Sequence, residues 1–181
     1  MMSPNIESKK RKILVLGLEK SGKTSIVLNV IGKDNLSNFI SLKESKSPNI
    51  VTFERDNLIF KIWDFRGKEV DRYEFLKNFN ELIDGTKEIF YVIDIQDIKN
   101  YELTLNFLQQ IIEKLKKLNL KTEFTFFLHK YDPDLFEQFP EINIEVVDSL
   151  IGKIKQIIPL EAFHEIYKST IYTILDKTHI Y

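Results

Sequence analysis

The chain contains no cysteine, and that absence excludes several kinds of site at once. Without thiols there is no disulfide framework, no thiol nucleophile, no thiolate metal ligand and no residue that a prenyl group would modify. The histidines, His129, His164 and His179, are too widely separated in the sequence to indicate a metal cluster. Any association with a membrane is therefore expected to come through a partner protein.

The sequence also has no excess of charge of one sign and no long apolar run. The 26 basic and 27 acidic side chains leave a formal net charge of −1, which gives no general attraction to nucleic acid. No apolar run approaches the ~18 residues of a membrane span. The polar start of the chain has no signal-peptide pattern, and its second residue is Met2 rather than the glycine that myristoylation requires. We expect a cytoplasmic protein with no nucleic-acid partner and no direct membrane anchor.

The order of apolar and polar segments predicts the fold class. Apolar runs alternate with amphipathic stretches, which is typical of βα units around a mostly parallel sheet, so we expect an α/β fold. We expect a polar tail over residues 1–11 and one domain over 12–181, with a final helix that is short or truncated. Expected strands are 13–16, 50–55, 58–63, 89–93, 124–128 and 163–174; expected helices are 23–31, 101–118 and 144–158, and 34–48 is expected to be a loop.

The first chemical motif occupies residues 17–24, which read GLEKSGKT and match the phosphate-binding pattern G-x-x-x-x-G-K-[ST]. It follows an expected strand and opens an expected helix, the context in which backbone N–H groups and the helix N-terminus wrap phosphates. Lys23 is expected to reach the β- and γ-phosphates, and the Thr24 hydroxyl to ligate Mg²⁺. A chance match in a lysine-rich loop is the alternative. The residues expected to contact nucleotide here are Glu19, Lys20, Ser21, Gly22, Lys23, Thr24 and Ser25.

The second motif is the sequence WDFRG at residues 63–67, which gives D-x-x-G at the end of an expected strand. Asp64 is expected near Mg²⁺, and the Gly67 N–H is expected to hydrogen-bond a γ-phosphate oxygen. By itself the pattern also fits an ordinary turn, but its place after a phosphate loop favours the metal-side interpretation.

The third motif, HKYD at residues 129–132, directly follows the expected strand 124–128. In open α/β sheets ligands bind beyond the carboxyl ends of strands. The Asp132 carboxylate matches the N1–H and the exocyclic amino group of guanine, a donor pair that adenine lacks. The aliphatic stem of Lys130 is expected to lie along the base or ribose, and His129 to hydrogen-bond neighbouring loops. Alone, the tetrapeptide fits a solvated polar turn better, but its place after the other two motifs favours recognition of the base.

Together, these motifs in this order resemble those of the Ras-like small GTPases. His129 stands where most of these proteins have Asn, which is similar to the Rag/Gtr branch, and residues 63–65 and 91–97 also look like Rag C/D. Arf-like proteins share the Trp-Asp pair and the Gly-Leu start of the loop. The resemblance implies a P-loop NTPase with a Ras-like three-layer fold, in which helices flank a mostly parallel six-stranded sheet. It also implies Mg²⁺, GTP or GDP as ligand, and effector or regulatory partners such as another Rag-like GTPase or a roadblock-type protein.

Three departures from the family pattern affect the catalytic expectations. Lys68 replaces the Gln that orients the attacking water, so we expect hydrolysis at or below the ~10⁻⁴ s⁻¹ of unaided small GTPases. Ser45, with Ser47 as a second possibility, is the candidate for the hydroxyl that the first switch loop supplies to Mg²⁺. A loop that contributes no ligand is the alternative. Thr173 is the candidate from the last base-contacting loop. Lys23, Gly67 and Lys68 are the residues expected to act on the γ-phosphate.

The motifs predict a guanine-nucleotide switch with slow GTP hydrolysis. A pseudo-GTPase that acts as a nucleotide-stabilised interaction module is the alternative that Lys68 favours. A P-loop kinase or ATPase is a further alternative, but adenine has no donor pair that the Asp132 carboxylate would recognise. For the aromatic residues Tyr73, Phe75 and Phe79, and for Leu76, the sequence allows either an effector surface or core packing, and packing is favoured for Phe75 and Phe79.

Overall fold

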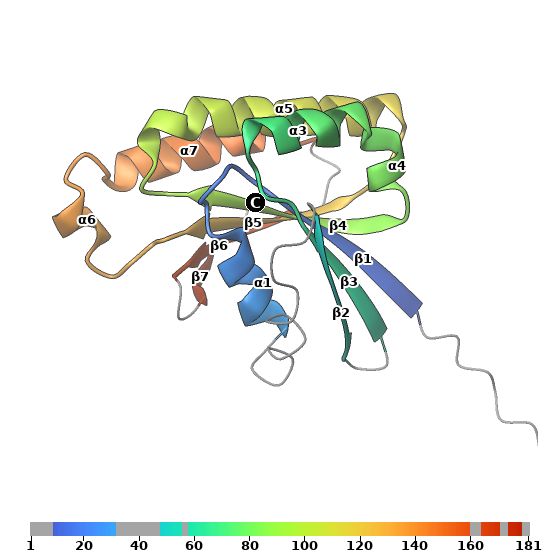
Figure 1. Cartoon of the computed structure of the whole chain (residues 1–181). Coiled ribbons are helices and arrows are strands. Elements are labelled where there is room, and N and C mark those ends of the chain that lie inside the picture. The colour runs from blue at the N-terminus through green and yellow to red at the C-terminus, as the bar shows by residue number, and fades with distance from the viewer. Residues whose placement is uncertain (1–8, 32–47, 56–57, 160–163, 171–173, 179–181) are drawn as a thin grey trace, which may run out of the picture.

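The structure is a computed structural model that describes residues 9–31, 48–55, 58–159, 164–170 and 174–178. Its centre is a seven-stranded sheet with the strand order β2-β3-β1-β4-β5-β6-β7 (Figure 1). The strands are β1 (Lys9–Leu16), β2 (Asn49–Arg55), β3 (Leu58–Asp64), β4 (Thr86–Asp94), β5 (Glu123–His129), β6 (His164–Ser169) and β7 (Ile174–Thr178).

The sheet is parallel from β3 to β6 and antiparallel at both edges. β2 pairs antiparallel with β3, and β7 pairs antiparallel with β6. The predicted mostly parallel α/β sheet is therefore confirmed, but its strand number was predicted wrongly, with six in place of seven. The expected strand 163–174 is in fact β6 alone, and residues 174–178 form a further strand, β7. Residues 174–178 read ILDKT, which neither alternates apolar with polar residues nor forms an apolar run, so the sequence did not indicate this strand.

Helices cover both faces of this sheet. In Figure 1, α3, α4, α5 and α7 lie over one face and α1 lies on the other. Among the described residues, no helix is long and apolar enough to cross a membrane. The helices are α1 (Lys23–Ile31), α3 (Glu69–Lys77), α4 (Phe79–Ile83), α5 (Tyr101–Lys117), α6 (Leu135–Gln138) and α7 (Ile144–Ile157), with one 3₁₀ turn, η2 (Ile98–Asn100).

Local sequence explains where the long helices begin and which side they bury. In α5, buried apolar residues recur at three- and four-residue spacing, as at Leu105, Leu108 and Ile112, so one face packs on the sheet. α7 begins after Asn143, whose side-chain oxygen accepts a hydrogen bond from the Val146 N–H at 3.0 Å. Such a cap satisfies one of the backbone donors that a helix start leaves free.

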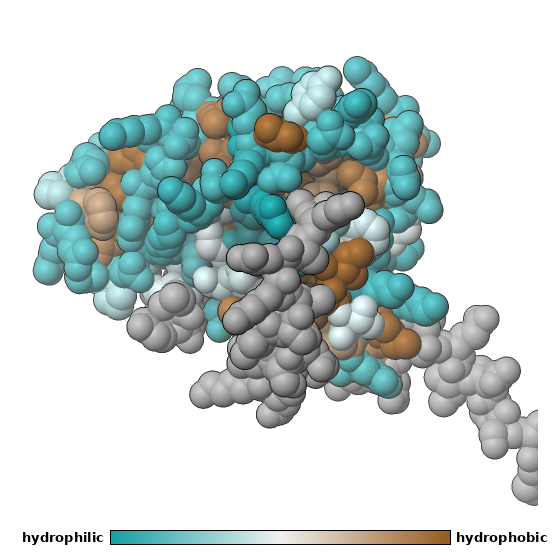
Figure 2. Space-filling view, viewed as in Figure 1, coloured by the Kyte–Doolittle hydropathy of each residue, from teal (hydrophilic) through white to brown (hydrophobic). Residues whose placement is uncertain are grey.

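The core is divided by the sheet into two clusters. The larger lies under α3, α5 and α7 and includes Tyr91, Phe75 and Phe79. Phe75 is 2% and Phe79 1% exposed, so the prediction that these rings pack the core is confirmed. Tyr73, by contrast, is 65% exposed on α3. The outer surface seen in Figure 2 is largely hydrophilic, with apolar residues gathered in smaller areas.

Candidate functional site

The loop between β1 and α1 has a backbone that only glycine tolerates at key points. Gly17 has φ 146° and Gly22 has φ 90°. A Cβ on Gly17 would lie 2.2 Å from the Val92 carbonyl oxygen. Both positions combine a left-handed backbone with a close neighbour, which is the usual reason for glycine in a loop that surrounds a ligand. The loop therefore presents backbone rather than side chains at the carboxyl end of the sheet.

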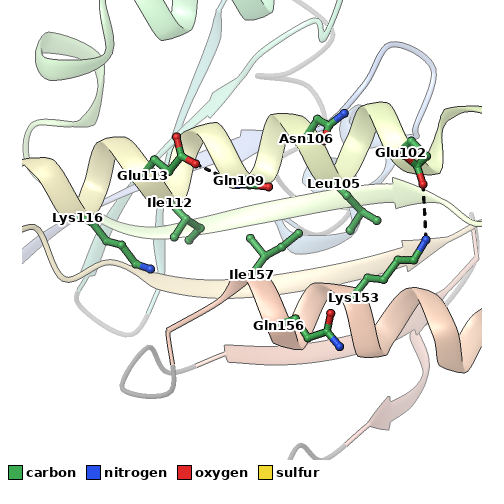
Figure 3. Close-up of a pocket in the computed structure, with 10 residues that line it drawn as sticks. All are labelled: Glu102, Leu105, Asn106, Gln109, Ile112, Glu113, Lys116, Lys153, Gln156 and Ile157. Atoms are coloured by element: carbon green, nitrogen blue, oxygen red, sulfur yellow. Dashed lines mark hydrogen bonds and ion pairs between the residues drawn. The ribbon is translucent and has the colours of Figure 1, made fainter.

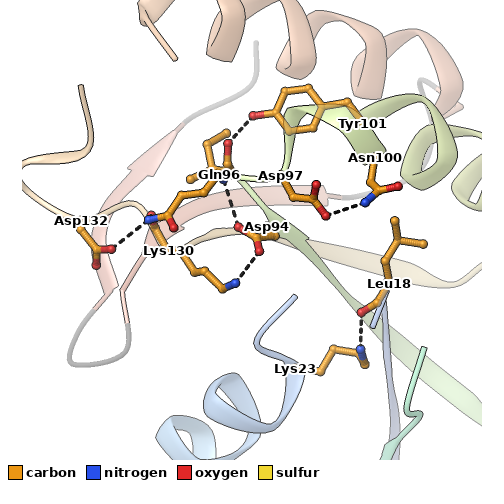
Figure 4. A network of polar contacts seen from close by, with 10 residues as sticks. Leu18, Lys23, Asp94, Gln96, Asp97, Asn100, Tyr101, Lys130 and Asp132 are labelled. Atoms are coloured by element: carbon orange, nitrogen blue, oxygen red, sulfur yellow. Dashed lines mark hydrogen bonds and ion pairs between the residues drawn. The ribbon is translucent and has the colours of Figure 1, made fainter. Parts of the chain in front are cut away.

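Lys23 is a buried cation at the start of α1. Its side chain is enclosed, with 5% of the residue exposed, and its Nζ donates a hydrogen bond to the Leu18 carbonyl oxygen at 2.6 Å (Figure 4). Burial lowers the pKa of the Lys23 amine to about 8, while the Asp64 and Glu19 carboxylates oppose that shift. An enclosed amine held inside a loop of backbone N–H groups suits the phosphates of a nucleotide.

Thr24 and Asp64 meet beside this lysine although they are far apart in sequence. The Thr24 hydroxyl donates to Asp64 Oδ2 at 2.9 Å. Asp64 ends β3 with 4% exposure, and burial raises the pKa of its carboxyl. Its Oδ1 is buried and has no hydrogen-bond partner in the described part of the chain. A buried, unpaired carboxylate oxygen next to a hydroxyl fits a hard divalent cation such as Mg²⁺, and these two residues would hold it.

The segment that follows Asp64 lies directly on the phosphate loop. Gly67 has φ 81°, and a Cβ on it would lie 2.3 Å from the Gly17 carbonyl oxygen and 2.7 Å from Lys23 Nζ. Arg72 Nη1 donates to the Gly67 carbonyl oxygen at 2.6 Å and links this glycine to α3. Lys68 is exposed at the start of α3 and makes no side-chain cap hydrogen bond there.

His129, at the end of β5, connects the third motif to the phosphate loop. It is 2% exposed, and its Nδ1 lies 3.1 Å from the Ser169 hydroxyl at the end of β6. A Cβ on Gly22 would lie 2.0 Å from His129 Cδ2, so the imidazole packs against the loop backbone. Burial, with the charge of Lys130, lowers the pKa of His129, which favours the neutral ring.

The contact between Gly22 and His129 predicts a stability difference between two glycines. Gly22→Ala is expected to lower the free energy of unfolding by about 2 kcal/mol, because its Cβ would meet a buried ring at a strained φ. Gly152→Ala is the control. It lies in α7 with nothing within 4 Å, and it is expected to stabilise the protein by about 0.5–1 kcal/mol. Urea unfolding without nucleotide measures both, and equal effects would contradict the prediction.

The other two polar residues of the third motif are held by side chains from the end of β4. The Lys130 ammonium pairs with Asp94. Gln96 Nε2 donates to the Lys130 carbonyl oxygen at 3.0 Å and to Asp132 Oδ2 at 3.1 Å (Figure 4). β4 and β5 are parallel neighbours, so their carboxyl ends lie side by side. Because ligands in open α/β sheets bind beyond the carboxyl ends of strands, the sequence could have indicated Asp94 and Gln96 as site residues.

Other contributions were visible only in the structure. Ser169 contacts His129 because β6 lies beside β5, and Arg72 reaches Gly67 from the next helix. Ser45, Ser47 and Thr173 lie outside the described residues. β6 ends at Ser169, so the loop after the last parallel strand begins earlier than the expected placement at Thr173.

The large surface groove of about 420 Å³ lies elsewhere, between α5 and α7 (Figure 3). None of its lining residues belongs to the three motifs. It carries both charge signs, with Lys153 Nζ 3.6 Å from Glu102 Oε1 at one end, and its walls are helix side chains rather than loop backbone. The groove therefore lies apart from the motif residues at the carboxyl end of the sheet.

Comparisons with known proteins agree with this arrangement. The family model described as the Gtr1/RagA G protein conserved region matches residues 12–176. Ras-related GTP-binding protein C of Mus musculus is 32% identical over 127 residues, which cover 70% of this chain and 31% of that protein. GTP-binding protein gtr2 of Schizosaccharomyces pombe is 31% identical over 124 residues, covering 68% of this chain and 38% of the relative. The aligned part thus spans less than half the length of these relatives.

A solved structure shows the same fold. The structure of the small GTPase Arl6 (BBS3) from Trypanosoma brucei, with the bound nucleotide analogue GppNp, superposes with a TM-score of 0.66. The match covers 90% of this chain and 88% of that one at 19% identity. At that identity the similarity extends to the fold alone.

Proposed function

The chain belongs to the Gtr1/RagA G protein family, and from this membership and the site geometry we propose that it is a guanine-nucleotide switch with Mg²⁺-dependent, slow GTP hydrolysis. The observation that carries the proposal is the meeting of three groups at one edge of the sheet. These are the buried Lys23 amine, the Thr24–Asp64 pair and the Asp132 carboxylate.

Each of these groups has a separate task in the proposal. Lys23 neutralises charge on the β- and γ-phosphates within the loop that Gly17 and Gly22 shape. Thr24 and Asp64 hold Mg²⁺, which when bound neutralises phosphate oxygens. Asp132 accepts two hydrogen bonds from guanine and leaves adenine without a matching pair. GTP and GDP are therefore the ligands we expect.

The switching element we propose is the segment that joins Gly67 to α3. Gly67 lies against the phosphate loop, and Arg72 ties its carbonyl oxygen to the helix. A γ-phosphate that engages the Gly67 N–H would therefore shift α3 as well. Val70 and Tyr73 on α3 are 72% and 65% exposed. We propose that effector or regulatory proteins bind this surface, whose position depends on the bound nucleotide. Such partners include a second Rag-like GTPase or a roadblock-type protein.

Lys68 supports slow hydrolysis, because an ammonium accepts no hydrogen bond from the attacking water. Lys68→Gln is expected to raise the single-turnover rate about tenfold, since glutamine at this position orients that water. Lys77→Gln, an equally exposed change at the other end of α3, is the control and is expected to leave the rate unchanged. An unchanged rate in Lys68→Gln would contradict the role assigned to this residue.

The proposed function is tested by identifying the nucleotide that copurifies and then measuring binding and turnover. We expect GTP or GDP to bind tightly, ATP to compete poorly, and chelation of Mg²⁺ to speed nucleotide release. Bound GTP with no turnover at all would favour the pseudo-GTPase, to which the lysine at position 68 points. A preference for ATP would contradict the guanine assignment.

A further inference from the structure

Gln96 holds the third motif from outside it. It follows β4 in a turn whose backbone is tied at several points. The Gln96 N–H donates to Asp94 Oδ1 at 3.0 Å, and the Ile95 N–H donates to the His129 carbonyl oxygen at 3.0 Å. The Tyr101 hydroxyl donates to the Ile95 carbonyl oxygen at 2.5 Å (Figure 4). The Gln96 side chain therefore starts from a fixed backbone, half-buried between the ends of β4 and β5.

Both donors of the Gln96 amide are used. Its Nε2 donates to Asp132 Oδ2 at 3.1 Å and to the Lys130 carbonyl oxygen at 3.0 Å. Both partners are acceptors only, so an amide turned by 180° would place its own oxygen against two oxygens. One orientation of the Gln96 side chain is therefore strongly favoured, and one carboxylate oxygen of Asp132 is fixed with it.

This contact bears on base recognition because guanine requires both oxygens of Asp132. The N1–H and the exocyclic amino group each need one carboxylate oxygen in the plane of the base. The terminal torsion of an aspartate is broad, so an unrestrained carboxylate would spend part of its time out of that plane. Each carboxylate oxygen has more than one lone pair, which lets Oδ2 accept from Gln96 and from the base together.

The neighbouring lysine shows that Gln96 also holds the backbone. Lys130 has φ 62°, a left-handed conformation that is uncommon for a residue with a side chain. Two contacts maintain it: the ion pair of its ammonium with Asp94, and the hydrogen bond of its carbonyl oxygen with Gln96. Asp132 lies two residues later. The position of its backbone, and with it the position of its carboxylate, therefore depends on the same Gln96 amide.

We propose that Gln96 is a positioning residue for guanine, which holds the Asp132 carboxylate in the plane of the base and so sets the preference for nucleotides that carry the exocyclic amino group. This inference rests on the proposed function. It gives the turn after β4 a role in base specificity. That turn lies outside the phosphate, D-x-x-G and HKYD motifs.

The test compares GTP with inosine triphosphate, which has N1–H but no exocyclic amino group. Gln96→Met keeps the length of the side chain and removes both donors. We expect it to weaken GTP binding about tenfold and inosine triphosphate binding much less, so that the ratio of the two affinities falls. Gln96→Glu places a second carboxylate beside Asp132 and is expected to lower the ratio further. Gln110→Met, the same change at an exposed position of α5, is the control.

The affinity ratio separates positioning from a purely structural role. A variant that only loosened the turn would weaken both nucleotides equally, and its melting temperature would fall. An unchanged ratio in folded Gln96→Met and Gln96→Glu would overturn the inference and leave the proposed function intact. If the unaltered protein bound neither nucleotide, both the inference and the proposed function would fail.

Discussion

Replacement of Lys23 with methionine is expected to lower the affinity for GTP and GDP about a hundredfold, which corresponds to about 2.7 kcal/mol. Lys23 is 5% exposed, and its amine donates to the Leu18 carbonyl oxygen within the loop that we propose holds the phosphates. Charge-assisted hydrogen bonds to phosphate oxygens contribute about 1.5–3 kcal/mol each, and methionine supplies none.

The same substitution is expected to leave the free energy of unfolding of the nucleotide-free protein unchanged or higher. Burial already lowers the pKa of Lys23 to about 8, which shows that the charged form is held there at a cost. Methionine fills a similar volume without that cost. Fluorescent nucleotide titration and urea unfolding measure the two quantities, with the exposed Lys99→Met as control. Nucleotide affinity that stays at the control value would refute the role of Lys23.

Asp132→Asn is expected to change the base that the protein selects. We expect GTP affinity to fall about a hundredfold, because the asparagine amide places a donor against the two donors of guanine and leaves buried groups unpaired. Xanthosine triphosphate carries a carbonyl in place of the exocyclic amino group and accepts from that amide. Its affinity is expected to rise above that of GTP.

The control for this exchange is Asp134→Asn, the same chemical change two residues along the chain. Asp134 is exposed directly before the short helix α6, and its carboxylate accepts a hydrogen bond from the Gln138 side chain. It is expected to leave both nucleotide affinities unchanged. Competition titrations with the two triphosphates measure the preference. A variant that bound neither triphosphate but unfolded normally would show that Asp132 positions the loop rather than reads the base.

Local patterns predicted much of the fold correctly. The apolar run at 13–16 lies in a buried strand, and the spacing of Leu105, Leu108 and Ile112 gave a helix with the correct buried face. These predictions succeed because burial on one face imposes a period that the sequence records. The edge strand β7, which pairs with β6, was missed because its residues ILDKT carry neither an alternating pattern nor an apolar run.

For the candidate site too, some residues were predicted from the sequence and others were recognised only in the structure. The sequence by itself predicted the loop glycines, Lys23 and Asp64 as candidate site residues, because each lies in a contiguous motif whose spacing is set by the length of one turn. It also shows Lys68 at the position where the resemblance to small GTPases implies glutamine.

Only the tertiary structure decided which groups hold those motif residues. The bond from Gln96 to Asp132, the contact of His129 with Ser169 and the packing of its ring on Gly22 each join segments that are distant along the chain. Such contacts depend on which strands are neighbours in the sheet and on where each strand ends. Strand order and strand ends follow from the packing of the whole domain, which no short stretch of sequence specifies.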